Sequence, residues 1–307
     1  MADVTGTAKK VIANVERAIV GKRPQIILSL VSWFCEGHVL LEDVPGVAKT
    51  MLARALAASV GCVFKRIQCT PDLLPTDVTG ASVFNPKTVE FEFRPGPIFA
   101  QVLLADEINR ASPRTQSALL EAMEEQQVSA DGTTHPLPQP FVVIATQNPL
   151  EQHGTHPLPE SQLDRFLMRL SLGYPDRAAE RALLTGQDRR SLLAGLLQQV
   201  SHSQWAVWQA QVQALHASDA LLDYLQDLVD ATRRTQALQQ GLSPRAALSL
   251  LKASRAHAWL EGRDFVAPQD LAAVWLPCTA HRVRALGAAP QRISDALQQL
   301  LQHTPLR

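Results

Sequence analysis

The sequence has little of what marks a disulfide-bonded or zinc-binding protein. Its 307 residues include only four cysteines, Cys35, Cys62, Cys69 and Cys278, and no two of them form a CxxC or CxxxC pair. Zinc sites usually draw on such closely spaced pairs, and disulfide frameworks are typical of much shorter secreted chains. We therefore expect neither, and predict free thiols buried in the fold.

An excess of charge of one sign and long apolar runs are also missing. Lys and Arg number 29, as do Asp and Glu, so the formal net charge is zero and gives no electrostatic case for nucleic-acid or membrane binding. No apolar run reaches the ~18 residues that span a bilayer, and residues 1–10 lack a signal-peptide pattern. We expect a cytoplasmic protein that neither inserts into membranes nor binds nucleic acid.

What the first half does contain is an alternation of short apolar runs and helical stretches. Apolar runs of this length between helices are typical of a parallel sheet buried on both faces. The first half is therefore predicted to be of the α/β class. The expected strands cover residues 39–41, 63–68, 101–105 and 141–145.

Residues 79–97 interrupt this alternation. Asn85-Pro86-Lys87 signals a turn, and residues 90–93 alternate Glu and Phe. This pattern predicts a small β-hairpin inserted into a helix. Phe91 and Phe93 either pack in the core or, by the analogy with the family named below, face a substrate or a pore, and the pattern does not decide between the two.

From residue 175 onward the chain is rich in Ala, Leu and Gln and shows no convincing strand. Apolar residues at 221, 222, 225, 228 and 229 form one helical stripe. Ser243-Pro244 indicates the start of another helix, and Gly262 its end. We therefore divide the chain into an α/β core, residues 1–174, and a small all-α domain, residues 175–307.

The loop at residues 43–50 follows the first strand and opens a helix, the setting of a Walker A phosphate loop. Backbone N–H groups at the helix N-terminus would bind phosphate oxygens, Lys49 would reach the β- and γ-phosphates, and Thr50 would hold Mg²⁺. Asp43 and Ala48 replace the two glycines of GxxxxGKT, so a chance Lys-Thr pair after a turn is the alternative. The predicted nucleotide contacts in this loop are Asp43, Val44, Pro45, Gly46, Val47, Ala48, Lys49, Thr50 and Met51.

Two adjacent carboxylates end the apolar run at residues 102–105. Asp106 would hold Mg²⁺ through water, and Glu107 would act as general base on the water that attacks ATP. A solvated acidic turn is the alternative for an isolated pair of this kind. Its place downstream of a phosphate loop favours the catalytic interpretation.

These residues belong to a longer pattern that resembles a known family. The segments DEINRA at 106–111, QSALLEAM at 116–123, QV at 127–128 and LPESQLDRF at 158–166 closely resemble the signature of MoxR-type AAA+ ATPases. The resemblance is dense from residue 20 to 166 and looser in the helical second domain. It implies a P-loop AAA+ core with an inserted β-hairpin and a small helical lid. Magnesium-chelatase motor subunits and MCM helicases look like more distant relatives.

The resemblance assigns roles to further side chains. Asn148 matches sensor 1, which would place the attacking water, although an ordinary Asn-Pro turn is the alternative. Arg165 looks like the arginine finger that reaches the γ-phosphate bound in a neighbouring subunit. It could instead pair with Asp164 or Glu160 on a helix face, and Arg110 is the rival finger.

Arg245 matches sensor 2, in the first turn of a predicted helix where a cation opposes the helix dipole. A nearby γ-phosphate would explain that placement, and an exposed surface arginine is the alternative. Val20 and Gly21 resemble the stretch of the family that contacts adenine, unless they are a plain loop. Many relatives carry Gly where Ala48 stands, and this departure bears on the rate of turnover more than on binding.

The resemblance also implies an activity and partners. It implies an ATP-hydrolysing, magnesium-dependent motor or chaperone that matures a partner complex, often with a partner bearing a von Willebrand factor A domain. A finger acting in trans requires a ring, expected to be a hexamer. Two other functions stay open: a nucleotide-gated scaffold with little turnover, and a nucleic-acid motor, against which the zero net charge argues.

Overall fold

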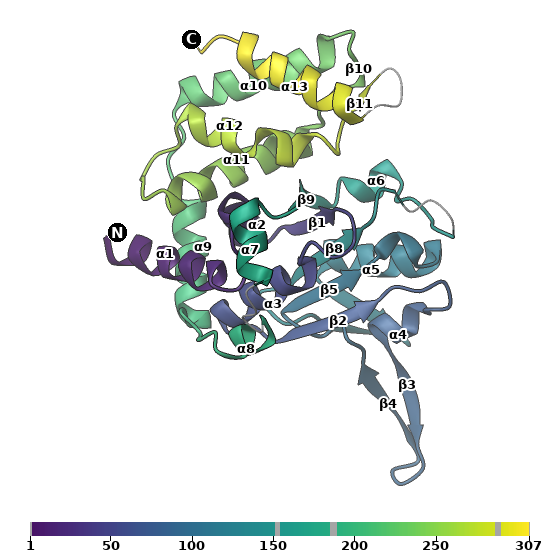
Figure 1. Cartoon of the computed structure of the whole chain (residues 1–307). Coiled ribbons are helices and arrows are strands. Elements are labelled where there is room, and N and C mark those ends of the chain that lie inside the picture. The colour runs from purple at the N-terminus through teal and green to yellow at the C-terminus, as the bar shows by residue number, and fades with distance from the viewer. Residues whose placement is uncertain (1, 151–153, 185–188, 286–289, 307) are drawn as a thin grey trace.

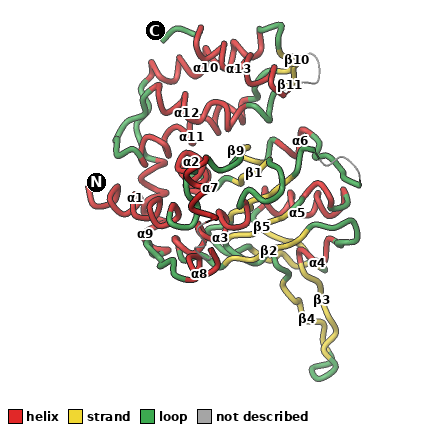
Figure 2. Tube along the Cα trace, in the orientation of Figure 1, coloured by secondary structure: helices red, strands yellow, loops and turns green. Residues whose placement is uncertain are grey.

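The computed structural model describes residues 2–150, 154–184, 189–285 and 290–306. Figure 1 shows an α/β body that carries a projecting hairpin at one end and a group of helices at the other. Figure 2 shows most strands gathered inside the body, with helices around them. No helix in the described part of the chain is both long and apolar enough to cross a membrane.

Five parallel strands form the central sheet, in the order β2-β5-β8-β1-β9. They are β1 (His38–Glu42), β2 (Phe64–Gln68), β5 (Val102–Asp106), β8 (Val142–Gln147) and β9 (Phe166–Leu170). The first four confirm the strands predicted from the apolar runs. The sequence analysis missed β9, which carries Arg169 in an otherwise apolar run and pairs this charge with Glu42 of β1 at 3.2 Å.

Both faces of the sheet are buried, as the apolar runs predicted. Alternate side chains of a strand point to opposite faces. On one face, Leu41 and Leu104 pack with α2 (Arg23–Phe34) and α3 (Lys49–Val60). On the other face, Leu40, Leu103 and Val143 pack with α5 (Pro113–Glu125). The remaining elements of the body are α1 (Ala2–Glu16), α4 (Pro75–Thr79), the 3-10 helix η1 (Ile108–Arg110), β6 (Gln127–Ala130), β7 (Thr133–Pro136) and α6 (Glu160–Leu163).

The predicted hairpin is present as β3 (Gly80–Asn85) and β4 (Glu90–Pro95), paired antiparallel along their full length. The expectation that it is inserted into a helix was half wrong, because α4 leads into it but turns follow it. Pro97 has a fixed φ and no N–H, and a side chain at Gly96 would come within 2.3 Å of the Val78 carbonyl oxygen. The chain leaves β4 in turns that hydrogen-bond to the end of α4, through Gly96 to Thr79 and Ile98 to Val78, and no helix resumes before β5.

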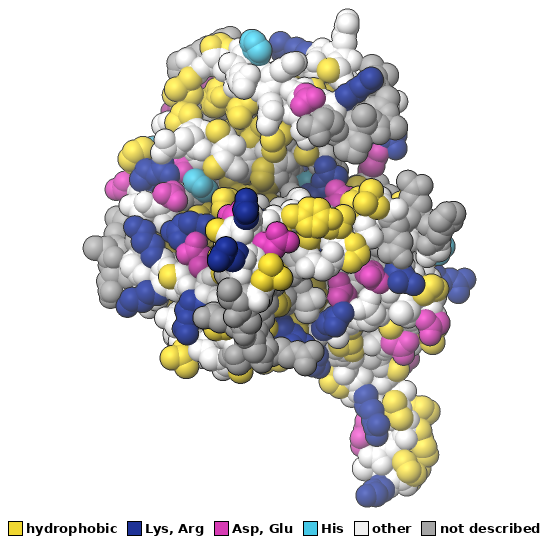
Figure 3. Space-filling view, viewed as in Figure 1, with side chains coloured by type: hydrophobic (Ala, Val, Ile, Leu, Met, Phe, Trp, Pro, Cys, Tyr) yellow, Lys and Arg dark blue, Asp and Glu magenta, His cyan; other side chains and the backbone are white. Residues whose placement is uncertain are grey.

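Apolar side chains are exposed along one side of the outer hairpin, beside charged ones (Figure 3), and they include Val83, Phe84, Val89 and Phe91. Phe91 is 74% exposed and its ring meets that of Phe84 edge-on. Phe93 instead stacks on the His135 ring with 3.9 Å between centroids. Of the two alternatives left open, exposure thus holds for Phe91, whereas Phe93 anchors the base of the hairpin.

The second half is helical, with one exception. Its helices are α7 (Arg177–Leu184), α8 (Arg189–Ala194), α9 (His202–Gln213), α10 (Asp219–Arg234), α11 (Pro244–Leu260), α12 (Pro268–Thr279) and α13 (Pro290–His303). The expectation of no strand was wrong, because β10 (Leu238–Gln240) and β11 (Arg284–Ala285) pair antiparallel. Two and three residues are too few to leave a period-2 pattern in the sequence.

The predicted ends of α11 have a clear structural basis. The Ser243 hydroxyl accepts a hydrogen bond from the Ala246 N–H at 3.1 Å, which caps the first turn. At the other end, Gly262 has φ 84° and the Arg263 N–H donates to the Ala258 carbonyl oxygen. This is a Schellman motif, which uses a glycine just past the helix.

All four cysteines are free thiols, as predicted. The prediction that they are buried holds for Cys69 and Cys278, whereas Cys35 and Cys62 are partly exposed. Cys35 follows the end of α2, and Cys62 lies in the turn after α3, where the chain leaves the interior.

Candidate functional site

The loop between β1 and α3 curls over the carboxyl edge of the sheet, which we define as the end at Glu42, Asp106 and Gln147. Its backbone is left-handed at Gly46, with φ 87°, and at Ala48, with φ 68°. A non-glycine residue pays about 1–2 kcal/mol for this conformation. Ala48 immediately precedes α3, so the strained residue is the one that turns the loop onto the helix N-terminus.

A cavity of about 350 Å³ lies against this loop. Pro45, Gly46 and Met51 form part of its wall. The cavity also brings together the side chains to which the sequence analysis gave roles in phosphate, metal and water binding, namely Lys49, Thr50, Asp106, Glu107 and Asn148. The ends of two neighbouring strands, β5 and β8, thus meet the loop after β1 and the start of α3 at one point of the sheet edge.

Lys49 folds back onto its own loop. Its Nζ donates to the Asp43 carbonyl oxygen at 2.6 Å and to the Val44 carbonyl oxygen at 3.3 Å. Partial burial lowers the pKa of the ammonium, and the nearby carboxylates of Asp43, Asp106 and Glu107 oppose that shift. The cation is therefore held beside the helix N-terminus, where a phosphate would also be attracted.

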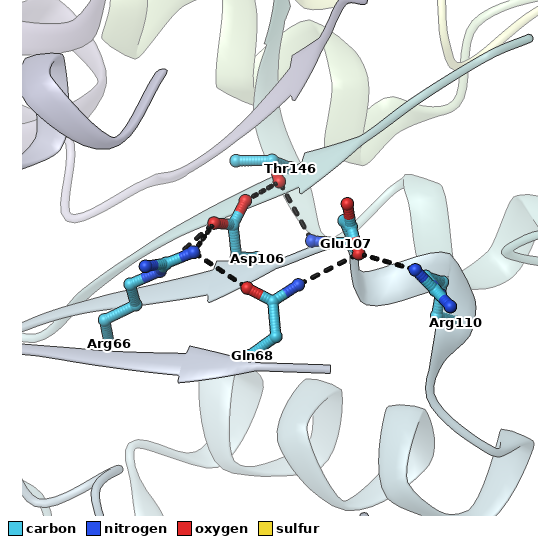
Figure 4. Close-up of polar contacts among 6 residues, drawn as sticks. All are labelled: Arg66, Gln68, Asp106, Glu107, Arg110 and Thr146. Carbon is cyan, nitrogen blue, oxygen red and sulfur yellow. Dashed lines mark hydrogen bonds and ion pairs between the residues drawn. The ribbon is translucent and has the colours of Figure 1, made fainter. Parts of the chain in front are cut away.

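The two adjacent carboxylates occupy different environments (Figure 4). Asp106 accepts from the Thr146 hydroxyl at 2.5 Å and from the Arg66 Nη2 at 2.6 Å. Glu107 has φ 57°, so its side chain leaves the line of the strand. It accepts from Gln68 Nε2 at 2.9 Å and from Arg110 Nη1 at 3.2 Å.

Three of these partners were not found by sequence reasoning. Arg66 and Gln68 lie on β2, whose register places Gln68 beside Asp106. Thr146 on β8 donates to Asp106 and accepts from the Glu107 N–H at 2.9 Å. All three reach the carboxylates because β5 lies between β2 and β8 in the sheet. A local sequence pattern does not predict this strand order. Arg110, named as a rival finger, lies beside Glu107 of its own chain.

The Asp43 side chain points away from the loop, whereas its main-chain oxygen stays in it. Its carboxylate accepts from the Ser171 hydroxyl at 2.8 Å, the Leu172 N–H at 2.5 Å and the Gly173 N–H at 3.1 Å. The side chain thus ties the loop to the segment after β9 and is buried there. Only its main-chain oxygen faces Lys49. Val47 is also buried, in the core that backs α3.

Asn148 forms the turn that was the alternative to sensor 1, and it also lines the cavity. Its Oδ1 accepts from the Leu150 N–H at 3.1 Å, which forms the Asn-Pro turn. The residue also lines the cavity with Lys49 and Glu107. Asn148 can therefore form the turn and still contact a ligand in the cavity.

Gly21, which follows Val20, lies against the start of α7. Val20 is exposed, and a Cβ on Gly21, whose φ is 74°, would meet the Asp176 carboxylate at 3.4 Å. Lys22 donates from Nζ to the Tyr174 carbonyl oxygen at 2.8 Å, which joins this stretch to the segment that Asp43 holds. The pair is thus linked to the phosphate loop through residues 171–174.

Arg165 and Arg245 lie at the opposite end of the sheet. We call this end, where β1 and β9 begin, the amino edge. Arg165 directly precedes Phe166, which pairs with His38 at the start of β1. The five residues of β1 separate this point from the phosphate loop, about 15 Å at the usual rise. Both arginines contact Glu124, Arg165 at 3.0 Å and Arg245 at 2.5 Å.

The alternative partners considered for Arg165 are occupied elsewhere. Glu160 pairs with Arg284, and Asp164 pairs with Arg282 at 3.2 Å. Arg245 is 57% exposed at its side chain, so it is a surface arginine, yet it is held by an ion pair. One chain therefore does not bring its two arginines to its own phosphate loop.

With this geometry in view, comparison with known proteins is informative. A model of the ATPase family associated with various cellular activities (AAA) matches residues 38–168, and an AAA lid domain model matches residues 230–302. The chain is 42% identical over 296 residues to Chaperone MoxR1 of Mycobacterium tuberculosis, covering 90% of this chain and 75% of that protein. The chain belongs to the MoxR-type AAA+ ATPases.

Two further matches agree with membership of the MoxR family. The uncharacterized protein YeaC of Bacillus subtilis is 52% identical over 262 residues, which cover 85% of this chain and 82% of YeaC. A solved structure described as a candidate ATPase of Cytophaga hutchinsonii has a TM-score of 0.90 and 35% identity, covering 100% of this chain and 96% of that one. The α/β P-loop fold with a lid is thereby confirmed.

Membership of the AAA+ MoxR family implies nucleotide binding, and the carboxyl edge fits a magnesium nucleotide. A half-buried lysine stands beside a helix N-terminus, in a cavity that also holds a hydroxyl and two carboxylates. Mg²⁺ prefers oxygen ligands, and one or two carboxylates with phosphate oxygens are its usual set. Thr50 and Asp106 are the residues that would supply the protein's share.

Proposed function

We propose that this chain hydrolyses ATP in a ring of identical subunits and uses the cycle to remodel or mature a partner protein. One observation carries the proposal. The side chains suited to binding and attacking a triphosphate lie at the carboxyl edge, whereas Arg165 and Arg245 lie at the amino edge. A site that needs both sets is completed only when two chains meet.

Within one subunit, each residue at the carboxyl edge has a proposed role. The N–H groups of the 43–50 loop and Lys49 bind the phosphates. Thr50 and Asp106 hold Mg²⁺, which when bound would neutralise phosphate charge. Glu107 takes the proton of the attacking water, and Asn148 orients that water. Val20 and Gly21 contact the base.

The neighbouring subunit supplies the cations. Its Arg165 would stabilise the charge that develops on the γ-phosphate, as arginine fingers do. Arg245 would act beside Arg165, and therefore also on the neighbour's nucleotide, because both side chains share Glu124. Lid and finger would then work as one unit across the subunit interface.

The assembly and its setting are further parts of the proposal. A finger in trans requires a closed ring, for which we propose a hexamer in the cytoplasm. Chaperone MoxR1 carries its role in its name, and we extend a chaperone role to this chain, with a von Willebrand factor A domain protein as partner. We also keep the division into a core, residues 1–174, and a lid, residues 175–307, as a prediction.

Steady-state ATP hydrolysis with Mg²⁺ at several protein concentrations tests this function. Specific activity should rise with concentration as rings form, and both Glu107→Gln and Arg165→Ala should lose turnover. Glu107→Gln should still bind ATP, because it keeps the loop and Lys49. Activity that survives in Arg165→Ala would remove the shared site, and activity that survives in Glu107→Gln would remove Glu107 as the general base.

A nucleotide-gated scaffold is the second candidate. It is favoured by the strained φ of Ala48 and by Arg66, which neutralises Asp106 from 2.6 Å. Under this function the wild type binds ATP at every concentration without turnover. Turnover that depends on Glu107 would exclude it.

A further inference from the structure

Glu124, in the last turn of α5, joins two arginines that come from distant parts of the chain. One carboxylate oxygen, Oε2, lies 3.0 Å from Arg165 Nη2, and the other, Oε1, accepts from Arg245 Nη2 at 2.5 Å. The hydrogen bond from Arg245 and the charge of Arg165 lower the pKa of this carboxyl. A single anion thus spaces two cations side by side.

Arg282 fixes the backbone next to Arg165. Arg282, whose side chain is only 4% exposed, donates from Nη2 to the carbonyl oxygens of Asp164 and Phe166 at 3.3 and 3.0 Å. Its Nε also lies 3.2 Å from the Asp164 carboxylate. The backbone on both sides of Arg165 is therefore pinned to the lid, while the Arg165 side chain itself turns to Glu124.

Glu124, Arg165 and Arg245 line one cleft of about 310 Å³ at the amino edge. Lys252 also lines it, and Asp164 lies 4.0 Å from Arg245 Nη1. The cleft opens between the body and the lid. A phosphate presented by a second copy of the chain would meet the arginines here.

We propose that Glu124 is a positioning residue that aligns Arg165 and Arg245 for the terminal phosphate of the nucleotide held by the neighbouring subunit. The inference rests on the proposed shared site. Glu124 itself does not touch that nucleotide. It acts through the two arginines, whose long side chains otherwise sample many rotamers and whose like charges repel.

Binding to Glu124 is compatible with binding to phosphate. A guanidinium has five N–H donors in a planar fork, and Glu124 contacts one Nη atom of each arginine. Arg245 Nη1 also lies 4.0 Å from Asp164, beyond hydrogen-bond distance, so donors of both forks are left for a phosphate, which arginine recognises well. An anion that fixes two forks in one orientation lowers the ordering cost at the moment of reaction.

The test compares Glu124→Gln with Glu125→Gln, which removes the same charge from the adjacent exposed residue of the same helix turn. Glu124→Gln should lower kcat about ten- to a hundredfold, the scale of a misplaced catalytic group. The KM for ATP should stay within about twofold, because the loop that binds ATP is intact. Glu125→Gln should match the wild type, and Glu124→Asp should recover part of the loss.

Mixing subunits separates positioning in trans from a structural role. Glu124→Gln chains keep a complete phosphate loop, and Glu107→Gln chains keep a complete pair of arginines. An equal mixture should therefore hydrolyse ATP faster than either variant alone. Arg165→Ala mixed with Glu107→Gln serves as the reference for the shared site.

Each outcome decides a different claim. If the reference mixture recovers activity and the Glu124→Gln mixture does not, Glu124 acts on its own subunit and the inference falls. If Glu124→Gln hydrolyses ATP as fast as or faster than the wild type, Glu124 does not align the arginines. If the reference mixture stays inactive while the wild type turns over, the proposed shared site fails.

Discussion

The two edges of the central sheet differ in what they offer a nucleotide. The carboxyl edge carries a strained loop, a helix N-terminus, Lys49 and two carboxylates around one cavity. The amino edge carries Arg165 and Arg245, joined by Glu124. Under the proposed function neither edge is a complete ATPase site, because the first lacks the proposed arginine finger and the second lacks the phosphate loop. The proposal therefore assigns activity to a contact between two chains.

The largest expected effect is a loss of turnover without a loss of ATP binding when the amino edge is altered. Arg165→Ala should lower kcat about 10³-fold or more, since arginine fingers in nucleotide hydrolases contribute 10³–10⁵. ATP affinity, measured with a fluorescent nucleotide, should stay nearly unchanged because the carboxyl edge is intact. Arg234→Ala, which removes an exposed lid arginine paired with Asp230, is the matched control and should keep full activity.

The next effect is a loss of stability when the anchor of the phosphate loop at the carboxyl edge, Asp43, is removed. Asp43→Ala should lower the free energy of unfolding by about 2–4 kcal/mol, because it leaves the Leu172 and Gly173 N–H groups without their acceptor. Urea denaturation measures the change. Asp223→Ala, at an exposed position of α10, should shift the midpoint little. A small effect of Asp43→Ala would contradict an anchoring role of its carboxylate.

A smaller effect is the loss of stability at low pH that is caused by His38, at the start of β1. Burial lowers the pKa of His38 to about 4. Its Nε2 donates to the Met123 carbonyl oxygen and its Nδ1 accepts from the Val143 N–H. The ring is therefore neutral in the fold, and it takes up a proton near pH 6.5 only when unfolded. Stability from this group is complete above about pH 6.5 and is lost as the pH falls towards 4.

His38→Gln isolates this term, because an amide supplies one donor and one acceptor without titrating. Between pH 7.5 and 5, the wild type should lose about 2 kcal/mol more unfolding free energy than the variant. His281, whose pKa burial lowers to about 3, is present in both proteins and cancels. Equal losses in the two proteins would contradict a buried neutral His38.

The smallest effect concerns strain in the loop. Ala48→Gly should raise the unfolding free energy by up to about 1 kcal/mol, because glycine adopts a positive φ without the steric cost. The same change at Ala58 inside α3 should lower it by about 0.5–1 kcal/mol. Thermal unfolding of both variants provides the measurement. Destabilisation by Ala48→Gly would mean that the left-handed turn is not strained.

Local sequence patterns predicted much of the carboxyl edge and the start of α11. The phosphate loop, the strand that ends in Asp106 and the cap at Ser243 each lie within a few consecutive residues, so backbone geometry follows from neighbours in sequence. Strand β9 escaped because Arg169 breaks its apolar run, and its charge is satisfied only by Glu42 on the adjacent strand.

Long-range contacts could not be predicted in this way. Arg66 reaches Asp106 because β2 and β5 are neighbours in the sheet, a fact of topology. Glu124 stands among the acids of an amphipathic helix and resembles a solvated face in sequence. Its meeting with Arg165 and Arg245 depends on where the lid docks.

Subunit mixing tests the central claim most directly. Glu107→Gln chains lack the general base and Arg165→Ala chains lack the finger, so each homogeneous protein should be nearly inactive with ATP and Mg²⁺. In an equal mixture, the intact carboxyl edge of one chain can meet the intact amino edge of the other. A shared site predicts ATPase activity well above that of either variant alone. A mixture as inactive as its components, beside an active wild type, would contradict a site built from two chains.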